Sequence, residues 1–352
     1  MKVCFITTGE SVASLKGIGR YANEIIERLG NVIETEVITT GRKKRINSFI
    51  YLPFKLMKSK SDLYHALVPD IATTLVMLKK NTIVTFHDLI PYYAWKTNIF
   101  KWKIRVAAKL WSSLVLKNVA EKCKLIITPS KQTAEELQDA FGIQKEKIKV
   151  IPEGVSDFFR PLNLERKYIL FFSNFSYRKR VDIAINAYKK FCEMVDNPPK
   201  LVIAGGYTRS AFQQQLPVEK LIKPIKDKAI IKNKASDEEV LKLYNQSYFL
   251  LFTSDYEGFG LPILEAARCK TIPIVRKEAK IPEEVESNGI VTETEQIAEI
   301  MYELYVNKNK RKILADRFYK KSLNYNWEKT IKQTLKVYEE VTEQKITKMV
   351  EN

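Results

Sequence analysis

Two glutamates, Glu257 and Glu265, are separated by seven residues in a segment that follows the apolar run Tyr248–Phe252. Between them, Gly258 and Gly260 allow backbone N–H groups to approach a ligand closely. A helix that begins directly after these glycines would present its N-terminus to an anion such as phosphate. Two carboxylates on such a strand–loop–helix suit hydrogen bonds to the vicinal hydroxyls of a sugar or ribose. A helix-capping loop with surface glutamates is the alternative interpretation.

A basic run and a histidine follow two other apolar segments. Arg178, Lys179 and Arg180 come after the apolar run Tyr168–Phe172, and such cations bind phosphate groups well, although a basic run is also common in solvated turns. The chain has only two histidines, and His87 directly follows an apolar stretch. A histidine at that position is either a packing residue or a group that contacts a ligand.

The elements that would position these residues follow from the hydrophobic pattern. Short apolar runs rich in β-branched residues alternate with longer segments of helical period, which is typical of parallel strands joined by crossover helices. The pattern predicts strands at Val3–Thr7, Thr35–Thr39, Leu63–Ala66, Thr82–Phe86, Leu125–Thr128, Lys149–Ile151, Tyr168–Phe172, Lys200–Ala204, Ala229–Ile231, Phe249–Phe252 and Thr271–Val275. It predicts helices at Tyr21–Leu29, Ile104–Ala120, Lys131–Phe141, Val181–Glu193, Asp237–Asn245, Pro262–Ala267 and Trp327–Thr342. We therefore expect an α/β fold with two doubly wound parallel sheets, which bind ligands at the carboxyl ends of their strands.

The segment Ile151–Pro161 interrupts both periodicities with two prolines and a glycine. We place the domain boundary there, with residues 1–160 as a first domain and residues 161–326 as a second. The length of 352 residues fits two domains of ordinary size.

The composition is that of a globular protein, with 45% hydrophobic and 28% charged residues. The formal net charge of +18 predicts an anionic partner, which nucleic acid, a phosphorylated substrate or a lipid surface would each satisfy. The four cysteines lie far apart without a C-x-x-C pair, so we expect free thiols and no zinc site. No apolar run has the length of a membrane span, and we expect the protein in the cytoplasm.

Basic and aromatic residues are concentrated in one part of the first domain. Residues 89–120 contain no Asp or Glu, and residues 41–60 hold seven further Lys or Arg without an acid. The basic residues of the first segment are Lys96, Lys101, Lys103, Arg105, Lys109 and Lys117, and its tryptophans are Trp95, Trp102 and Trp111. This combination predicts a helix that lies on an anionic membrane surface, and an exposed basic face over a core helix is the alternative. Because no nucleic-acid-binding motif accompanies the patch, we expect no nucleic-acid partner.

The segment from Glu257 to Glu265 resembles the signature of the retaining glycosyltransferases of family four, also called glycosyl transferases group 1. Six further segments match that family in its order: Gly17–Tyr21, Val84–Leu89, Ile127–Ser130, Ile151–Val155, Phe172–Arg180 and Asn326–Glu328. The similarity covers almost the whole chain and is somewhat greater to mannosyltransferase-type members. It implies the GT-B fold, in which two Rossmann-like domains face a cleft. It also implies a C-terminal helix, about residues 327–352, that crosses back onto the first domain.

The resemblance also implies a role for each matched residue. Lys179, with Arg178, would hold the donor diphosphate, Glu265 the ribose hydroxyls and Glu257 the hydroxyls of the transferred sugar. His87 would lie beside the reacting sugar, so His87, Glu257 and Lys179 are the expected catalytic residues. The other expected donor-binding residues are Gly17, Gly19 and Arg20 in the first loop, and Gly258, Phe259, Gly260 and Leu261, which would offer backbone N–H groups.

By the same resemblance, the reaction moves a hexose from a nucleotide-sugar to a glycan or lipid-linked acceptor in cell-surface glycan synthesis. The donor sugar would keep its anomeric configuration. GDP-mannose is the first choice of donor, and UDP-glucose is close behind. We expect no metal and no other cofactor, because Lys179 and a helix dipole would stabilise the leaving group and the sequence has no plausible Asp-x-Asp motif.

The chain departs from the family pattern at Ser173 and Asn174, where many members have Gly-Arg, so Arg178 or Arg180 would supply the missing charge. Two alternatives remain. One is another enzyme on the same fold, such as an epimerase or a phosphorylase, although a phosphorylase would need a pyridoxal-phosphate lysine and a longer chain. The other is a non-catalytic basic module that binds membrane or nucleic acid, against which the intact matched residues argue.

Overall fold

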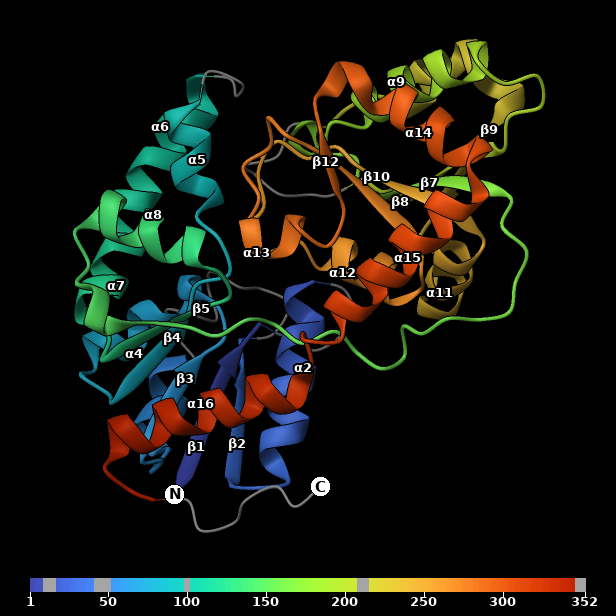
Figure 1. The fold of residues 1–352 in the computed structure, drawn as a ribbon. Coiled ribbons are helices and arrows are strands. Elements are labelled where there is room, and N and C mark those ends of the chain that lie inside the picture. The colour runs from blue at the N-terminus through green and yellow to red at the C-terminus, as the bar shows by residue number, and fades with distance from the viewer. Residues whose placement is uncertain (9–16, 41–51, 98–101, 208–214, 346–352) are drawn as a thin grey trace. The chain divides into compact units, whose positions relative to one another are not determined.

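The computed structural model describes residues 1–8, 17–40, 52–97, 102–207 and 215–345. The chain forms two compact units, of which the first combines residues 1–154 with residues 326–352 and the second comprises residues 155–325. Each unit is built on one parallel six-stranded sheet with helices on both faces (Figure 1). The expected α/β class with two doubly wound sheets is therefore confirmed. The domain boundary placed after residue 160 stays a prediction.

The sheet of the first unit has the strand order β2-β1-β3-β4-β5-β6. Its strands are β1 Lys2–Thr7, β2 Glu34–Thr39, β3 Leu63–Ala66, β4 Thr82–Thr85, β5 Leu125–Thr128 and β6 Ile148–Val150. Its helices are α2 Ile18–Gly30, α4 Ala72–Met77, α5 Ile90–Lys96, α6 Trp102–Trp111, α7 Lys117–Lys122, α8 Lys131–Phe141 and α16 Trp327–Thr342. A π-helical segment, Ser112–Leu116, joins α6 to α7.

The sheet of the second unit has the order β12-β11-β10-β7-β8-β9. Its strands are β7 Tyr168–Asn174, β8 Lys200–Gly206, β9 Ala229–Asn233, β10 Ser247–Phe252, β11 Ile272–Arg276 and β12 Ile290–Thr292. Its helices are α9 Val181–Glu193, α10 Val218–Leu221, α11 Asp237–Asn245, α12 Leu261–Arg268, α13 Glu283–Glu286, α14 Ile297–Val306 and α15 Lys308–Ser322. Read from its other edge and counted within the unit, this is the order 3-2-1-4-5-6 of dinucleotide-binding sheets.

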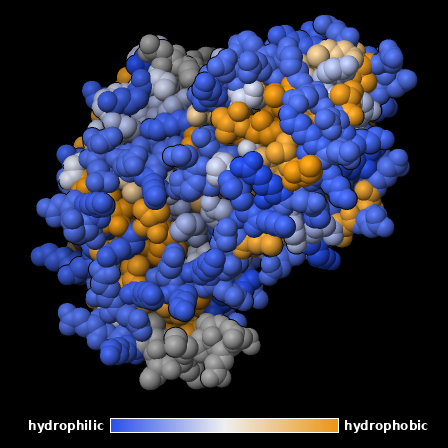
Figure 2. All heavy atoms as spheres, in the orientation of Figure 1, coloured by the Kyte–Doolittle hydropathy of each residue, from blue (hydrophilic) through white to orange (hydrophobic). Residues whose placement is uncertain are grey.

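Alternation along the strands builds two apolar layers in each unit. Val3 and Phe5 face α2 and α16, whereas Cys4 and Ile6 face the cluster under α4, α7 and α8. In the second unit, one face of the sheet packs on α9 and α14 and the other on α11 and α12. Polar side chains cover most of the face seen in Figure 2, and apolar side chains gather in a few patches. No helix among the described residues is long and apolar enough to cross a bilayer.

The last described helix, α16, completes the core of the first unit, as the resemblance predicted for the C-terminal helix. Asn326 caps it by accepting a hydrogen bond from the backbone N–H of Lys329 at 3.0 Å. Trp327 and Tyr338 are buried against β1, β3 and α2. A Cβ on Gly154 would lie 2.5 Å from the backbone nitrogen of Trp327, so only glycine permits this approach. The helix ends at Thr342 and not near residue 352, and residues 346–352 lie outside the described part of the chain.

Candidate active site

The order of the second sheet reverses between β7 and β10, which are hydrogen-bonded neighbours. The connections from these two strands leave the sheet in different directions, and a crevice at such a switch point is where doubly wound sheets bind ligands. The loop after β7 carries Arg178 and Lys179 in a short turn, Tyr177–Lys179. The loop after β10 carries Glu257 and leads into α12. The fold therefore brings the predicted basic run and the predicted glutamate to the same edge.

Glu257 forms ion pairs with two of the three cations of the basic run, Arg178 and Lys179. The Lys179 Nζ donates a hydrogen bond to Oε1 of Glu257, and Nη1 of Arg178 lies 3.1 Å from Oε2. All three side chains are largely buried. Burial alone would raise the pKa of the Glu257 carboxyl, but Lys179 and Arg178 hold that pKa at about 2. Glu257 is therefore ionised at neutral pH, and two cations face one carboxylate.

A second carboxylate, Asp255, joins the loops after β7 and β10 beside this cluster. Its Oδ1 accepts a hydrogen bond from Nη1 of Arg276 at 2.6 Å and lies 3.4 Å from Nη1 of Arg180. Its backbone N–H donates to the carbonyl of Arg178 at 2.8 Å. Arg180 is also paired with Asp182 at 2.9 Å, so its charge is shared between two acids of its own surroundings. The sequence analysis did not single out Asp255 and Arg276. The only feature that could have indicated them is that each follows a predicted strand.

The segment after Glu257 forms the N-terminus of α12, as the sequence predicted. Gly260 is the N-cap with a φ of 108°, a conformation that side chains rarely adopt, and Phe259 is buried. Glu265 lies inside α12 and is only 4% exposed, and its Oε2 accepts a hydrogen bond from the Tyr244 hydroxyl at 3.0 Å. The predicted contacts of Gly258, Phe259, Gly260, Leu261 and Glu265 with a donor stay predictions.

The other predicted residues belong to the first unit. Gly17 caps α2 with a φ of 55°, whereas Gly19 and Arg20 lie in the first turn of that helix and not in a loop. Residues 9–16 precede them and lie outside the described part of the chain, and so does most of the loop that was expected to close on a phosphate.

His87 follows β4 and has both ring nitrogens on acceptors of its own unit. Its Nδ1 lies 3.0 Å from Oε1 of Glu153, and its Nε2 donates to the carbonyl oxygen of Leu67 at 3.0 Å. Burial alone would lower the pKa of His87, but the hydrogen bond and the charge of Glu153 raise that pKa above its ordinary value. Glu153 therefore favours the protonated form of this buried ring. Glu153 lies in the matched segment Ile151–Val155, but nothing in the sequence indicated this pairing.

A chain of polar contacts runs from His87 toward α16. The ring of Tyr21 meets the His87 ring edge-on, with the centroids 4.6 Å apart, and the Tyr21 hydroxyl lies 3.4 Å from Oγ1 of Thr85. Thr85 also contacts Nε2 of His65 at 2.8 Å, and Nδ1 of His65 contacts the Tyr338 hydroxyl at 2.6 Å. Burial lowers the pKa of His65 to about 3, so this second histidine is neutral.

Two family models match the chain in sequence. "Glycosyltransferase Family 4" matches residues 40–157, and "Glycosyl transferases group 1" matches residues 155–321. The O-antigen chain mannosyltransferase RfbU of Salmonella typhimurium is 25% identical over 81% of this chain and 79% of its own length.

Solved structures of the same fold cover nearly the whole chain. HepE of Anabaena in complex with UDP-glucose has a TM-score of 0.75 at 15% identity, with 97% of this chain and all of that chain covered. A sucrose-phosphate synthase from Thermosynechococcus elongatus has a TM-score of 0.77 at 17% identity, with 97% of this chain and 98% of that chain covered. At these identities the structural likeness shows the fold alone.

The two histidines give a direct test of the buried charges. We expect one imidazole proton resonance to titrate with a midpoint above 6.5, since Glu153 raises the pKa of His87, and the other to stay neutral until strongly acidic pH. Glu153→Gln should move the first midpoint below 6.5, because burial then acts without the carboxylate. Glu146→Gln, at an exposed acid of the same unit, serves as the control. Proton NMR from pH 4 to 9 measures both, and an unchanged midpoint in Glu153→Gln would refute the assignment.

The sign of the His87 effect on stability follows from the raised pKa. The free energy that the His87–Glu153 pair contributes to folding is fully present below the unfolded pKa of 6.5. It is lost as the pH rises through the higher folded pKa. Glu257 behaves in the opposite way, because its stabilisation is lost as the pH falls from 4.5 toward about 2.

Proposed function

Because the chain belongs to the glycosyltransferases of family 4, we propose that it transfers a hexose from a nucleotide-sugar. The acceptor is a hydroxyl of a glycan or of a lipid-linked molecule in cell-surface glycan synthesis. The similarity to an O-antigen chain mannosyltransferase supports mannose from GDP-mannose as the first choice. A UDP-glucose complex of a protein with the same fold keeps UDP-glucose as the second.

The charge cluster after β7 and β10 carries this proposal. Arg178 and Lys179 bring two buried cations to the switch point of the second sheet, and both pair with the single carboxylate of Glu257. A nucleoside diphosphate would add negative charge beside the same two side chains, in a place where low exposure strengthens the attraction. The sheet order and the basic turn together therefore favour a diphosphate-bearing donor over other ligands.

In the proposed reaction, Lys179 and Arg178 stabilise the charge that develops on the departing diphosphate. Glu257 holds hydroxyls of the transferred sugar, and Glu265 holds those of the ribose. The acceptor attacks from the face that the diphosphate leaves, so the anomeric configuration is retained and the diphosphate assists removal of the acceptor proton. No metal is required in this scheme, and full turnover in the presence of a chelator would support it.

His87 is proposed to hold a hydroxyl of the reacting sugar. In its protonated form, which Glu153 favours, the ring offers only N–H donors, and Nδ1 is occupied by Glu153. The donor available to a sugar is therefore Nε2–H, which now bonds to the carbonyl of Leu67. Glu153 then acts as a positioning residue, because it fixes both the orientation and the charge of the ring.

The donor site is tested with Lys179→Ala and Glu265→Ala. Each should weaken nucleotide binding by about 1.5–3 kcal/mol, the range for hydrogen bonds to charged groups. Thermal shifts measured against a panel of UDP-, GDP- and ADP-sugars identify the donor and give the affinities. Lys190→Ala and Glu193→Ala, at exposed positions near the end of α9, are the matched controls. Wild-type affinity in both folded site variants would remove the donor-site assignment.

For His87, we expect His87→Ala to lower kcat by a much larger factor than it lowers nucleotide affinity, because the ring would contact the sugar and not the nucleotide. Steady-state kinetics with the donor found above, together with nucleotide titration, separate the two effects. Glu153→Gln should reproduce part of the loss in kcat and shift its pH dependence. Turnover at the wild-type rate in folded His87→Ala would assign the residue to packing alone.

The first unit presents a surface that fits the predicted attachment to an anionic membrane. Helices α5 and α6 lie side by side (Figure 1), and Arg105 Nε donates to the carbonyl of Trp95 at 3.3 Å. Apolar side chains at four-residue spacing are exposed along α6 and the π-helical segment: Trp102 69%, Val106 49%, Leu110 55% and Leu114 68%. Lysines flank this stripe, including Lys103 and Lys109.

This arrangement supports an interfacial helix better than a basic cover over a core helix, because the apolar side chains face outward. Each Lys or Arg near an anionic surface contributes about 1 kcal/mol, and salt screens the attraction. Lys101 and the basic residues 42–45 lie outside the described part of the chain. A lipid-linked acceptor at the membrane would be the functional reason for the attachment.

Vesicle co-sedimentation tests the attachment. We expect binding to vesicles with anionic lipid that decreases at high salt, and little binding to neutral vesicles. Lys103→Gln with Lys109→Gln, and separately Trp102→Ser with Leu110→Ser, should each reduce the bound fraction severalfold. Lys122→Gln with Lys124→Gln is the control, since these lysines are exposed in the same unit away from α6. Equal binding to neutral and anionic vesicles, or no binding to either, would favour a soluble acceptor.

A further inference from the structure

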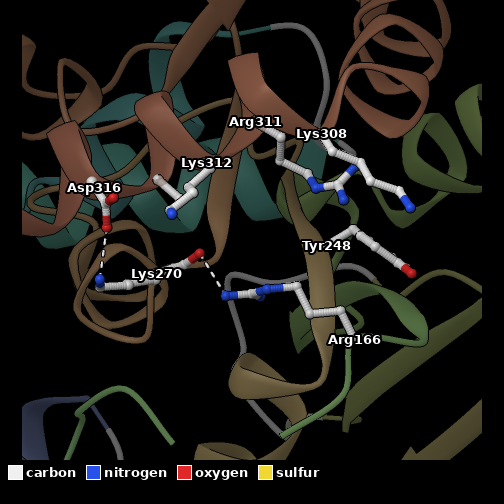
Figure 3. A pocket seen from close by; sticks show the side chains of 8 residues that line it. Arg166, Tyr248, Lys270, Lys308, Arg311, Lys312 and Asp316 are labelled. Atoms are coloured by element: carbon white, nitrogen blue, oxygen red, sulfur yellow. Dashed lines mark hydrogen bonds and ion pairs between the residues drawn. The ribbon is translucent and has the colours of Figure 1, made fainter. Parts of the chain in front are cut away.

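A cationic pocket of about 270 Å³ lies at the edge of the second sheet opposite the candidate active site. Arg166 precedes β7, Tyr248 stands near the start of β10, and Lys270 precedes β11. Arg178, Lys179 and Glu257 follow the other ends of these strands, so the two sites lie on opposite edges. Helix α15 covers the pocket with Lys308, Arg311, Lys312 and Asp316 (Figure 3).

The lining is strongly positive. Five of its side chains are cationic and one is a carboxylate, Asp316, which is already bound to Lys270 at 2.6 Å. Among the residues that the structure describes, Arg166, Lys308, Arg311 and Lys312 form no ion pair. Glu165 lies close to Tyr248 but is exposed and does not line the pocket. Asp316 also lies near enough to Lys312 for that lysine to lower the pKa of its carboxyl, so the five cations and one carboxylate leave an excess of four positive charges in the lining.

Arg166 forms the floor of the pocket and is bound only to uncharged acceptors. Its Nη1 donates to the carbonyl of Ser247 and to Oγ1 of Thr271 at 2.9 Å. Its Nη2 donates to the carbonyls of Cys269 at 3.3 Å and Lys270 at 2.7 Å. Burial, with the nearby charge of Arg311, lowers the pKa of Arg166 to about 10. The guanidinium is held rigidly and contributes charge, and this charge would be compensated by an anion.

Arg311 can offer hydrogen-bond donors to a ligand, whereas Nη1 and Nη2 of Arg166 are already bound to protein acceptors. The guanidinium of Arg311 lies 5.0 Å from the ring centroid of Tyr248, and its Nη1 donates to the carbonyls of Leu304 and Tyr305, each at 2.7 Å. Its Nε and Nη2 have no hydrogen-bond partner among the described residues. Lys308 and Lys312 are one helical turn apart on the same helix, so a ligand would meet an arginine fork between two lysines.

We propose that this pocket binds a phosphate-bearing anion. It would be a site of the second unit that is separate from the candidate active site. Multiple cations around a guanidinium suit a multiply charged phosphate better than a single carboxylate. The volume holds a phosphate or diphosphate group and is below the usual range for larger ligands, so a whole nucleotide-sugar does not fit. A free phosphate compound or a lipid headgroup would provide this chemistry.

Calorimetric titration of the full chain with inorganic pyrophosphate tests the pocket. The titration uses a Lys179→Ala background, so that the candidate active site contributes least. We expect Arg311→Gln with Lys312→Gln to weaken binding at least about tenfold, because two charged donors are lost. Lys308→Gln with Lys312→Gln should do so as well and leaves the bonds of Arg311 to α14 intact. Arg317→Gln with Lys320→Gln, which removes equal charge from the same helix outside the pocket, should bind normally.

The same variants titrated with a short-chain phosphatidic acid below its micellar concentration distinguish the sources. Loss of pyrophosphate binding alone in the pocket variants supports a free phosphate ligand, and loss of phosphatidic acid binding alone supports a lipid headgroup. Loss of binding to both compounds supports a site that recognises the phosphate group itself. Binding that is unchanged in both pocket variants, or reduced equally in the Arg317 and Lys320 control, would overturn the proposal.

Discussion

A carboxylate that is taken out of water needs a counter-charge, and the pairing of Glu257 with Lys179 and Arg178 meets this need across two separate segments. Because the cations follow β7 and the carboxylate follows β10, one cluster fixes both loops at the point where the strand order reverses. Asp255 and Arg276 form a further buried ion pair beside this cluster. The removal of Glu257 would leave two buried cations without their shared carboxylate, and an uncompensated buried charge typically costs about 3–5 kcal/mol. Electrostatics, and not loop packing alone, therefore shapes this edge of the sheet.

The first unit shows how a partner decides the state of a buried group. His65 and His87 are both enclosed, yet only His87 faces a carboxylate, Glu153, and only its pKa is raised. His65 has the hydroxyls of Thr85 and Tyr338 instead and stays neutral. The pKa values of two buried histidines of the same unit are thus shifted in opposite directions, because only one of them faces a carboxylate.

The sequence predicted the fold well because its information is local and periodic. Every predicted strand is present, and the helices at Lys131–Phe141, Val181–Glu193 and Asp237–Asn245 agree with the structure at both ends. The short strand β12, in which only Thr292 is buried, was missed, and so was α15, because few of its apolar residues are buried. The contacts of Arg178 and Lys179 with Glu257 were not predictable, since they join residues about eighty positions apart. The pairing of His87 with Glu153 and the pocket of Arg166 and Arg311 depend in the same way on tertiary proximity.

The return of α16 to the first unit has a consequence for the order of biosynthesis. The strands of the first unit precede the second unit in the sequence, but the core of the first unit includes Trp327 and Tyr338, which the ribosome adds only after the second unit. The second unit is continuous from residue 155 to residue 325 and has all its segments earlier. Domains usually fold in the order in which they are synthesised. In this chain the unit whose strands emerge first must wait, with one face of its sheet lacking α16, until the whole of the second unit has been translated.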